Sequence, residues 1–516
     1  MVRENITIDS LLIKNFGPIG KAEINMKKLT VFIGPNNAGK SYVATLFYAL
    51  SNALMETSKV SQRIIVHRIR KIIINALNKE QTNDQTKQLI FIPEEEISQL
   101  MKEYSKVLAE NVNIFINREF GTDIDKLKRN ANTHVAIEIR TNIGTVQLVS
   151  KKNNLEIISF THKIRKLSIQ FNYNDVTNQK RGIRLGRSLR CKIDNSKIDT
   201  LTLTVSLPYP KLILFDEGKE SRITEYEIMI YELASIISKE LFGASTEMRH
   251  RVSSNSLYYL PAARSGILQG HRVLLSNFLK LLPSNFGVSD FTVERFSGVV
   301  ADFLSNIIEL DDEKKYLYEL AVEYEDKIIN GNVILSQEEN RMNYSIEYKF
   351  RKMKIPLNRS SSTVSETAPI FLFLKHVLNM NDTVIIEEPE AHLHPSNQLL
   401  MADLITQMIR KDIKIVLTTH SEILLEEINN KLLKSINKGL EQSKMDDPRI
   451  LFLQKSEISV YNFKINNKNN RTVVKELKID NEFGVPQDEF IKVHEELYEQ
   501  FMIITEPNSA DAPNKR

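Results

Sequence analysis

The clearest chemical signal in the sequence is a glycine-rich loop near the start of the chain. Residues 34–41 read GPNNAGKS, which fits the phosphate-loop pattern G-x-x-x-x-G-K-[ST]. Glycines let the backbone N–H groups wrap around phosphate oxygens, Lys40 can reach the terminal phosphates, and Ser41 offers a hydroxyl to Mg²⁺. A turn that binds nothing is the alternative, which the strand expected before the loop and the helix expected after it disfavour. The candidate nucleotide contacts are Gly34, Pro35, Asn36, Asn37, Ala38, Gly39, Lys40 and Ser41.

Two adjacent carboxylates follow an apolar run far along the chain. The run TVII at residues 383–386 is typical of a buried strand, and EEPE follows it. Ligands of open α/β sheets bind at the carboxyl ends of strands. We therefore expect Glu387 to hold Mg²⁺ through water and Glu388 to orient and deprotonate the attacking water. Surface acids in a turn are the alternative, which the presence of a phosphate loop disfavours.

A third strand-like run ends in a histidine. Residues 413–421 read IKIVLTTHS, so His420 follows two threonines at the end of an expected strand. His420 could donate a hydrogen bond to the γ-phosphate or position the water. A purely structural histidine is the alternative, and the place of His420 after a carboxylate strand favours the functional interpretation.

Taken together, GPNNAGKS, IIEEPEAHLHP and LTTHSE resemble the ABC-type P-loop ATPases, and within them the OLD-like (overcoming lysogenization defect) and SMC-like branch that includes ATPases of prokaryotic antiphage defence. The resemblance covers residues 1 to about 50 and about 256 to 430. It implies an α/β fold, an ABC-type P-loop NTPase head with a mixed sheet and helices, plus an inserted helical and antiparallel β region. It also implies ATP and Mg²⁺ as cofactors, hydrolysis of ATP to ADP and phosphate, and a homodimer or higher homo-oligomer.

The resemblance implies two further segments at a dimer interface. HLHP at residues 392–395 corresponds to the D-loop of the family, although taken alone it could equally begin a helix with Pro395 in the first turn. A signature segment should present a serine and a helix N-terminus to the γ-phosphate of the other protomer. The candidate is SSSTVSE at residues 360–366, which lacks the glycines of the common LSGGQ pattern. The candidate phosphate contacts are Ser361, Ser362 and Ser365.

The start of the helix after this segment is open. Thr363 and Glu366 could form a capping box, while Pro369 leaves the first helical residue uncertain. A serine-rich cap without a ligand is the alternative. Arg264, at the end of a strand-like run, could contact phosphate or form a structural ion pair. The glutamine loop of the family has no clear match, with Gln147 and Gln170 as weak candidates.

Apolar periodicity predicts the elements that must position these residues. β-Branched alternating runs predict an antiparallel sheet within 134–214, and a hairpin is expected at 333–350. There is no sustained heptad run, which excludes a long coiled-coil arm. Other strands are expected at 10–16, 29–33 and 256–260, and helices at 40–50, 58–77, 94–120, 223–241, 268–282 and 290–310.

These elements suggest a head split by an insertion. We expect an N-terminal ATPase lobe at 1–57, a helical and β insertion at 58–250, a C-terminal ATPase lobe with the signature, carboxylates and histidine at 251–430, an α/β extension at 431–505 and a disordered tail at 506–516.

Composition narrows the setting and the partners. The chain has 516 residues, of which 42% are hydrophobic, so it can bury a large core. Cys191 is the single cysteine, so no intrachain disulfide can form, which suits a reducing compartment. Neither a signal peptide nor an apolar run of ~20 residues is present, so membrane insertion is not expected and a cytoplasmic setting is the default.

Net charge alone does not indicate nucleic-acid binding. The net charge is +4, from 69 basic and 65 acidic residues. The most basic stretch, Lys163 to Lys192, could track a phosphate backbone, although a solvated loop is the alternative. Its basic residues are Lys163, Arg165, Lys166, Lys180, Arg181, Arg184, Arg187, Arg190 and Lys192.

Two classes of function follow. The first is an ATP-gated dimer that acts as a DNA-associated sensor or switch with a separate effector protein, such as a nuclease, because the chain after His420 shows no nuclease motif. The second is an ATP-bound scaffold or inhibitor that holds a partner protein with little or no turnover. Glu387, where aspartate is more usual, keeps the second class open. A transporter ATPase is disfavoured by the large insertion.

Overall fold

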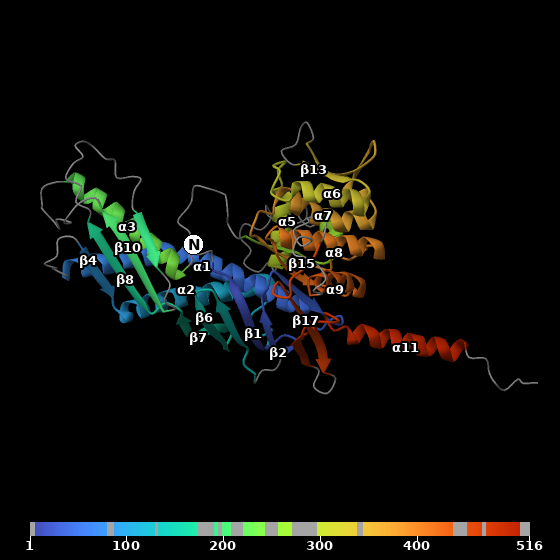
Figure 1. Ribbon diagram of the computed structural model, residues 1–516, viewed down its shortest axis with the longest axis horizontal. Helices are drawn as coiled ribbons and strands as arrows, with labels where there is room; N and C mark the ends of the chain where they lie inside the picture. The colour runs from blue at the N-terminus through green and yellow to red at the C-terminus, as the bar shows by residue number, and fades with distance from the viewer. Residues whose placement is uncertain are drawn as a thin grey trace, which may run out of the picture.

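The structure is a computed structural model that describes residues 6–79, 87–128, 133–173, 190–194, 199–207, 220–242, 256–270, 297–337, 344–436, 451–466 and 471–505. Helices α5 to α9 gather at one end of the molecule, and α3 lies with a second, smaller sheet at the other (Figure 1). None of the described helices is long and apolar enough to cross a membrane.

A mixed sheet of 11 strands connects the two ends within the described residues. Its order is β11-β15-β16-β3-β17-β18-β2-β1-β5-β6-β7. The strands β11, β15, β16, β3 and β17 are parallel to one another, and most of the remaining pairs are antiparallel. The bounds are β1 Ile8–Phe16, β2 Ile19–Asn25, β3 Leu29–Ile33, β5 Ala136–Thr141, β6 Gly144–Lys151, β7 Asn154–His162, β11 Leu257–Leu260, β15 Thr383–Glu387, β16 Lys414–Thr418, β17 Ile458–Asn466 and β18 Arg471–Glu476.

The parallel strands are buried on both faces, as parallel sheets usually are. Strand β3 shows this arrangement, because Phe32 packs into a core with α1 while Leu29, Val31 and Ile33 pack into a second core with α8 and α9. The helices of the second core cover the face opposite to α1. They are α5 Gly298–Ile308, α6 Tyr318–Ile329, α7 Ser362–His376, α8 Pro395–Arg410 and α9 Glu422–Ile436.

Helix α1 runs without a break from Lys40 to Lys79, over 40 residues. We expected two helices, at 40–50 and 58–77, and this division is wrong. Thr57 and Ser58 fit inside the helix because their hydroxyls donate to the carbonyls of Ala53 and Leu54, at 2.6 and 3.0 Å, and α1 packs against α2 and α3. The boundary expected at residue 57 therefore falls inside a continuous helix.

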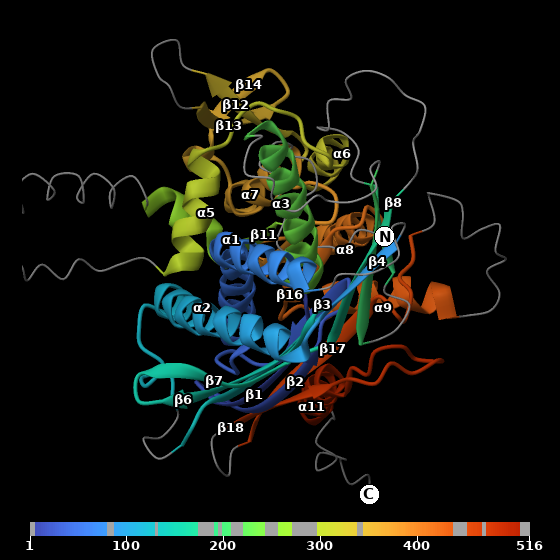
Figure 2. The same ribbon diagram turned by 90° about the vertical axis from the view of Figure 1, so that its left-hand side faces the viewer.

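Two helices from the expected insertion pack against α1. Helix α2, Glu94–Phe120, has the expected bounds, and α3, Glu220–Phe242, lies close to the expected range. Figure 2 shows α1 and α2 lying side by side across the sheet. The inserted helices thus pack directly on the helix that follows the phosphate loop.

The β region expected at 134–214 divides between two sheets. Strands β5 to β7 extend the main sheet by pairing with β1. The second sheet has the order β4-β8-β10-β9, and its β8 and β10 are parallel, so the expectation of a single antiparallel sheet is wrong. Strands β2 and β4 were not expected. The bounds are β4 Lys87–Ile92, β8 Lys166–Tyr173, β9 Arg190–Asp194 and β10 Thr200–Leu207.

The hairpin expected at 333–350 is present as β12 Asn332–Gln337 and β13 Tyr344–Phe350, followed by β14 Met353–Pro356. Helix α11, Asp488–Thr505, projects from the body (Figure 1). Most of the helix expected at 268–282 and the whole tail at 506–516 lie outside the described residues.

Candidate functional site

The candidate residues meet at the carboxyl ends of three neighbouring parallel strands. Phe32 of β3 is paired with Thr418 of β16, which is in turn paired with Glu387 of β15. The chain continues this alignment beyond the strands, because the N–H of Thr419 donates to Phe32 O at 3.1 Å and the N–H of Glu388 donates to Thr418 O at 2.9 Å. The phosphate loop, the carboxylates and His420 therefore share one edge of the sheet.

The phosphate loop has a backbone that requires glycine at two positions. Gly34 has φ +134° and Gly39 has φ +94°, both in the region that L side chains rarely adopt. A Cβ at Gly34 would lie 2.4 Å from the carbonyl oxygen of Phe463, and one at Gly39 would lie 2.7 Å from Cγ of Pro18. The loop thus packs closely against β17 at Gly34 and against Pro18 at Gly39, and neither position has space for a Cβ.

Lys40 lies inside this loop. Its Nζ donates to the carbonyl oxygens of Gly34 and Pro35, at 2.8 and 3.0 Å. Burial lowers the pKa of Lys40 to about 8, against the opposing charges of Glu388, Glu390 and Glu387. Since these three carboxylates act on Lys40, the structure brings together the phosphate loop and the acids that the sequence separates by more than three hundred positions.

The two adjacent carboxylates have different environments. Glu387 is buried, its Oε2 accepts from the N–H of Ala262 at 3.1 Å, and its Oε1 has no hydrogen-bond partner within the described residues. The side chain of Glu388 is 42% exposed, and its Oε1 lies 3.6 Å from Nε2 of His420. Glu388 also has a positive φ of 44°, so its side chain leaves the strand in an unusual direction. One carboxylate is therefore fixed and inward, and the other faces the open side of the site.

Glu390 takes part in the site, which the sequence interpretation missed. Its Oε1 accepts from the hydroxyl of Thr419 at 2.7 Å and from the N–H of His420 at 2.8 Å. Burial raises the pKa of Glu390, and these hydrogen bonds oppose that effect. The last acid of EEPE thus fixes the turn that carries the histidine. The signal was present, because three acids follow one strand in the sequence.

His420 is held as a neutral group. Burial lowers the pKa of His420, as does the nearby charge of Lys40, while Glu388 opposes both. A neutral imidazole can donate one hydrogen bond and accept another. The ring is therefore suited to orienting a polar group between itself and Glu388.

Arg264 forms a structural ion pair. Its side chain is fully buried and lies 3.4 Å from Oε1 of Glu366. Its guanidinium donates to the carbonyl oxygens of Glu387 and Glu388, at 2.6 and 3.2 Å, and to that of Pro261 at 3.1 Å. Of the two alternatives for Arg264, the structure supports the ion pair. Arg264 holds the backbone of the carboxylate segment in place.

The candidate signature segment begins helix α7, but a different residue caps the helix. Ser361 is the N-cap, and its hydroxyl accepts from the N–H of Val364 at 3.3 Å. The expected capping box of Thr363 and Glu366 is wrong, because Glu366 points into the core toward Arg264. Pro369 lies within the helix, beyond its first turn.

The three candidate serines differ in exposure. Ser361 and Ser362 are exposed, whereas Ser365 is buried and donates to Ser361 O at 2.8 Å. The hydroxyl of Thr363 donates to His392 O at 2.8 Å, which joins the signature segment to the D-loop candidate. Within the described residues, no hydrogen bond or ion pair joins these serines to the phosphate loop of the same chain.

HLHP also begins a helix. His394 is the N-cap of α8, its ring accepts from the N–H of Ser396 at 3.3 Å, and Pro395 is the first helical residue. The helix start expected from the sequence is therefore confirmed.

The weaker candidates lie away from this edge. Gln147 lies on β6 and bonds to Glu138 and Ser159, and Gln170 lies on β8 of the second sheet. In the basic stretch, Lys163 and Arg165 lie between β7 and β8, Lys166 begins β8, and Arg190 and Lys192 are on β9. The others, Lys180, Arg181, Arg184 and Arg187, lie outside the described residues.

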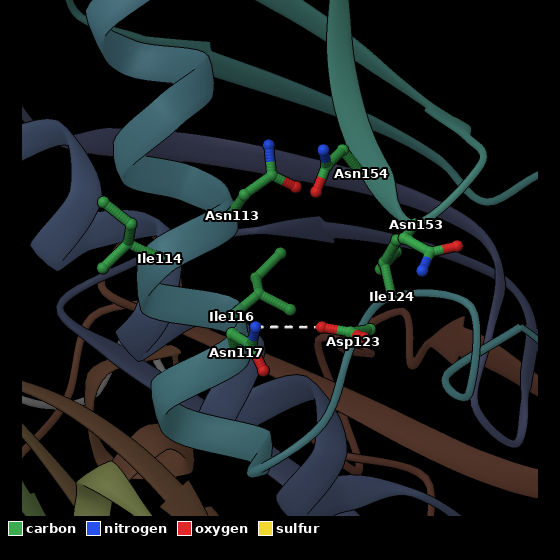
Figure 3. A pocket seen from close by; sticks show the side chains of 8 residues that line it. All are labelled: Asn113, Ile114, Ile116, Asn117, Asp123, Ile124, Asn153 and Asn154. Carbon is green, nitrogen blue, oxygen red and sulfur yellow. Dashed lines mark hydrogen bonds between the residues drawn. The ribbon is translucent and has the colours of Figure 1, made fainter. Parts of the chain in front are cut away.

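A pocket lies between the end of α2 and the turn that joins β6 and β7, away from the candidate residues (Figure 3). Three of its polar side chains, Asn113, Asn117 and Asp123, bond to neighbouring protein groups. Asn117 donates to Asp123 at 2.9 Å, and Asn113 donates to Leu155 O at 2.9 Å. Nothing in this pocket marks it as a second reactive site.

The residues at the sheet edge fit a magnesium nucleotide. The loop has positive φ at Gly34 and Gly39 and no space for a Cβ at either, which suits a backbone that wraps phosphate oxygens. Lys40 donates hydrogen bonds to loop carbonyls, and the oxygens of a bound phosphate could replace these carbonyls as its partners. The buried Oε1 of Glu387 has no hydrogen-bond partner among the described residues, and carboxylate oxygen is a ligand suited to Mg²⁺ or to its water.

Comparison with known proteins agrees with this geometry. A family model described as AAA ATPase domain matches residues 7–425. The chain belongs to the AAA ATPase domain family. The match to the AAA ATPase domain contains the phosphate loop, Glu387, Glu388 and His420. No curated protein matches the chain.

Three solved structures are similar to this AAA ATPase domain at low identity. They are an Smc head bound to the C-winged helix domain of ScpA (12% identity, TM-score 0.34, 92% of this chain and 98% of that chain covered), an Smc head with an extended coiled coil bound to the C-terminal domain of ScpA from Pyrococcus furiosus (12%, 0.35, 96% and 100%), and an SMC head domain from Thermotoga maritima (10%, 0.31, 92% and 99%). These likenesses are distant, and the family assignment rests on the match over residues 7–425.

Proposed function

We propose that this AAA ATPase domain binds magnesium ATP at the shared edge of β3, β16 and β15 and hydrolyses it to ADP and phosphate. The observation that carries this proposal is the strand register, which brings the phosphate loop after β3, the carboxylates at the end of β15 and the turn of His420 after β16 to one edge of the sheet. The loop and the carboxylates are more than three hundred positions apart in the sequence, and a chance turn would not assemble them.

Each residue has a part in the proposal. The backbone of the phosphate loop holds the phosphates, and Lys40 leaves the loop carbonyls to pair with the terminal ones. Ser41, exposed at the start of α1, and the free oxygen of Glu387 would hold Mg²⁺ or its waters. Bound Mg²⁺ supplies neutralisation of charge on the phosphate oxygens.

Glu388 is the proposed general base. It is the more exposed of the two adjacent acids and lies 3.6 Å from His420, so a water could bond to both side chains. Glu388 would accept the proton of the attacking water, and neutral His420 would orient that water or bond to the γ-phosphate. The backbone of both residues is fixed, by Arg264 for Glu388 and by Glu390 for His420.

Steady-state turnover of ATP tests the proposal. Glu388→Gln should retain ATP binding and lower kcat by about 10²–10⁴-fold, because it removes a general base. Glu426→Gln, an exposed acid on α9, is the matched control and should leave kcat unchanged. If the wild type binds ATP but turns over no faster than Glu388→Gln, a scaffold or inhibitor that holds a partner protein replaces the ATPase.

We further propose an ATP-gated homodimer in which the signature segment of one protomer completes the site of the other. Ser361 and Ser362 are exposed at the N-terminus of α7, where backbone N–H groups favour an anion. The D-loop candidate is hydrogen-bonded to the same turn through Thr363. Both features suit a surface that meets the phosphates of a second copy.

The most specific part of the proposal is a role as an OLD-like, DNA-associated sensor. This sensor would act in antiphage defence with a separate effector nuclease. Its support is the basic stretch from Lys163 to Lys192 and the resemblance of the motifs. DNA binding that strengthens with ATP and weakens steeply with salt would support this role. Binding that is insensitive to charge reversal at Arg184 and Arg187 would remove it.

A further inference from the structure

We propose that Tyr259 is a positioning residue for Glu387, and that its hydroxyl joins this carboxylate to the helix that follows the phosphate loop. The inference rests on the proposed function, in which Glu387 holds Mg²⁺ or its water. It adds a residue that no sequence motif marked, since YYLP reads simply as a strand end.

Strand register places Tyr259 and Glu387 on one face of the sheet. Tyr259 of β11 is paired with Ile385 of β15, and Glu387 follows Ile385 by two residues. Because side chains alternate between faces, residues two apart along a strand share a face. Tyr259, Ile385 and Phe32 all pack into the core that contains α1. A long side chain on β11 can therefore reach the end of β15.

The hydroxyl of Tyr259 lies 3.3 Å from Oγ1 of Thr45, which is one helical turn beyond Ser41 on α1. Glu387 lies on the same face of the sheet, at the end of the strand beside Tyr259. Burial raises the pKa of Tyr259 well above its ordinary value, and the charge of Glu387 adds to this effect. A phenol between these two groups can donate toward the carboxylate while it accepts from Thr45.

The carboxylate of Glu387 is then held from two sides. The N–H of Ala262, three residues after Tyr259, donates to Oε2 at 3.1 Å. Oε1 is buried and has no hydrogen-bond partner within the described residues, so one oxygen stays available. Glutamate has one more rotatable bond than the aspartate usual at this place, so it needs more support to keep one orientation. Tyr259 and Ala262 supply that support from the same strand end.

Such outer partners of a metal-binding carboxylate have a measurable effect. Their loss typically costs about 10–100-fold in metal affinity or activity. Tyr259 also connects the two parts of the proposed metal site, because Thr45 is on the helix of Ser41 and Tyr259 is on the strand beside Glu387. Removal of one oxygen atom should therefore weaken the metal more than the nucleotide.

The experiment compares ATP binding with Mg²⁺ and with EDTA by titration calorimetry, and measures Mn²⁺ affinity in the presence of a non-hydrolysable ATP analogue by electron paramagnetic resonance. Tyr259→Phe should leave ATP affinity in EDTA unchanged and weaken Mn²⁺ binding by about tenfold or more. Thr45→Val should weaken Mn²⁺ binding in the same direction and less. Thermal melting verifies that both variants are folded.

Tyr258→Phe is the matched control. Tyr258 precedes Tyr259 on β11, and its ring packs edge-on against Phe373 in the opposite core, 6.0 Å between centroids. This variant should bind Mn²⁺ as the wild type does. In a Glu387→Gln background, Tyr259→Phe should add no further loss, because the carboxylate it positions is gone.

The experiment distinguishes failure of the positioning role of Tyr259 from failure of the proposed ATPase function. If Tyr259→Phe binds Mn²⁺ as tightly as the wild type, or if its effect adds fully to that of Glu387→Gln, the positioning role is overturned while the ATPase proposal stands. If the wild type binds no ATP with or without metal, the proposed function itself fails.

Discussion

At the scale of residues, the site depends on groups that never touch a nucleotide. Arg264 fixes the carbonyls of Glu387 and Glu388, and Glu390 fixes the turn of His420. Arg264 is fully buried and its charge is compensated by several hydrogen bonds, whereas Glu390 is half-buried and accepts two hydrogen bonds on Oε1. In the proposed reaction, Glu388 would accept the proton of water from a position that the hydrogen bond of Arg264 to its carbonyl oxygen fixes.

Arg264 gives a prediction at this scale. Arg264→Met should lower the free energy of unfolding by about 3–5 kcal/mol, because it leaves Glu366 as an uncompensated buried charge. Urea denaturation measures the change. Arg359→Met, at an exposed position, is the control. An unchanged urea midpoint for Arg264→Met would contradict the structural role assigned to the ion pair.

At the scale of elements, the sequence predicted the bounds of a helix correctly where local residues mark both of its ends. Helix α2 has its expected bounds because Pro93 precedes it and Gly121, with φ +65°, ends it. Helix α1 was divided because its serines and threonines read as a break, whereas they bond back to helix carbonyls. The parallel pairing of β8 and β10 joins distant segments, so no local alternation of residues could indicate it.

The residues of the candidate site could likewise be predicted only where a local motif marks them. Motif residues at the ends of β3, β15 and β16 could be named from the sequence because strand ends of parallel sheets gather ligands. The supporting roles could not be assigned, because Glu366 was interpreted as part of a helix cap and Tyr259 only as part of the strand expected at 256–260. Their partners are set by the packing of β11 and α7 on β15, which is a tertiary effect.

The junction of α2 and α5 contains a buried carboxyl group whose raised pKa gives a second prediction. Glu119 is buried against Gly298 at the start of α5, with Arg118 at 3.4 Å. Burial raises the pKa of Glu119 to about 7; Asp302 adds to the increase, and Arg118 and the N–H of Val299 oppose it. Tyr48 of α1 donates to Asp302 at 2.9 Å, which brings a third helix to this junction.

Because the folded state binds the proton of Glu119 more tightly than the unfolded chain, its contribution to stability is present at low pH and is lost as the pH rises through about 7. Glu119→Gln should therefore raise the free energy of unfolding at pH 8 by about 1–3 kcal/mol, with a smaller gain at pH 5. Denaturation at both pH values measures this. Glu110→Gln, exposed on the same helix, is the control. A gain that is equal at both pH values would exclude the titration of Glu119 as its cause.

At the scale of the whole molecule, the proposed dimer predicts that two defective proteins can restore each other. Lys40→Ala damages the phosphate loop, and Ser362→Arg blocks the exposed start of α7. Each should be inactive alone. An equal mixture should recover about one quarter of wild-type turnover, because half of the dimers are mixed and each contains one intact site.

The control is a mixture of Lys40→Ala and Glu388→Gln. Both changes damage the same half of a composite site, so every site in the mixture keeps one defect and no activity should return. Recovery in this control, or none in the Ser362→Arg mixture, would mean that the sites are not shared between protomers as proposed.

Because α1 is unbroken, a change in the orientation of its first turn at the phosphate loop also moves its distant end. A helix of 40 residues is about 60 Å long. Its first turn holds Ser41, and its later turns pack against α2, α3 and β4. A tilt of about 5° at the loop would move the distant end by about 5 Å, which is the height of one helical turn. In the proposed function, a small adjustment of the first turn at a bound phosphate would therefore be enlarged along α1 into a displacement of the segments that pack against its far end.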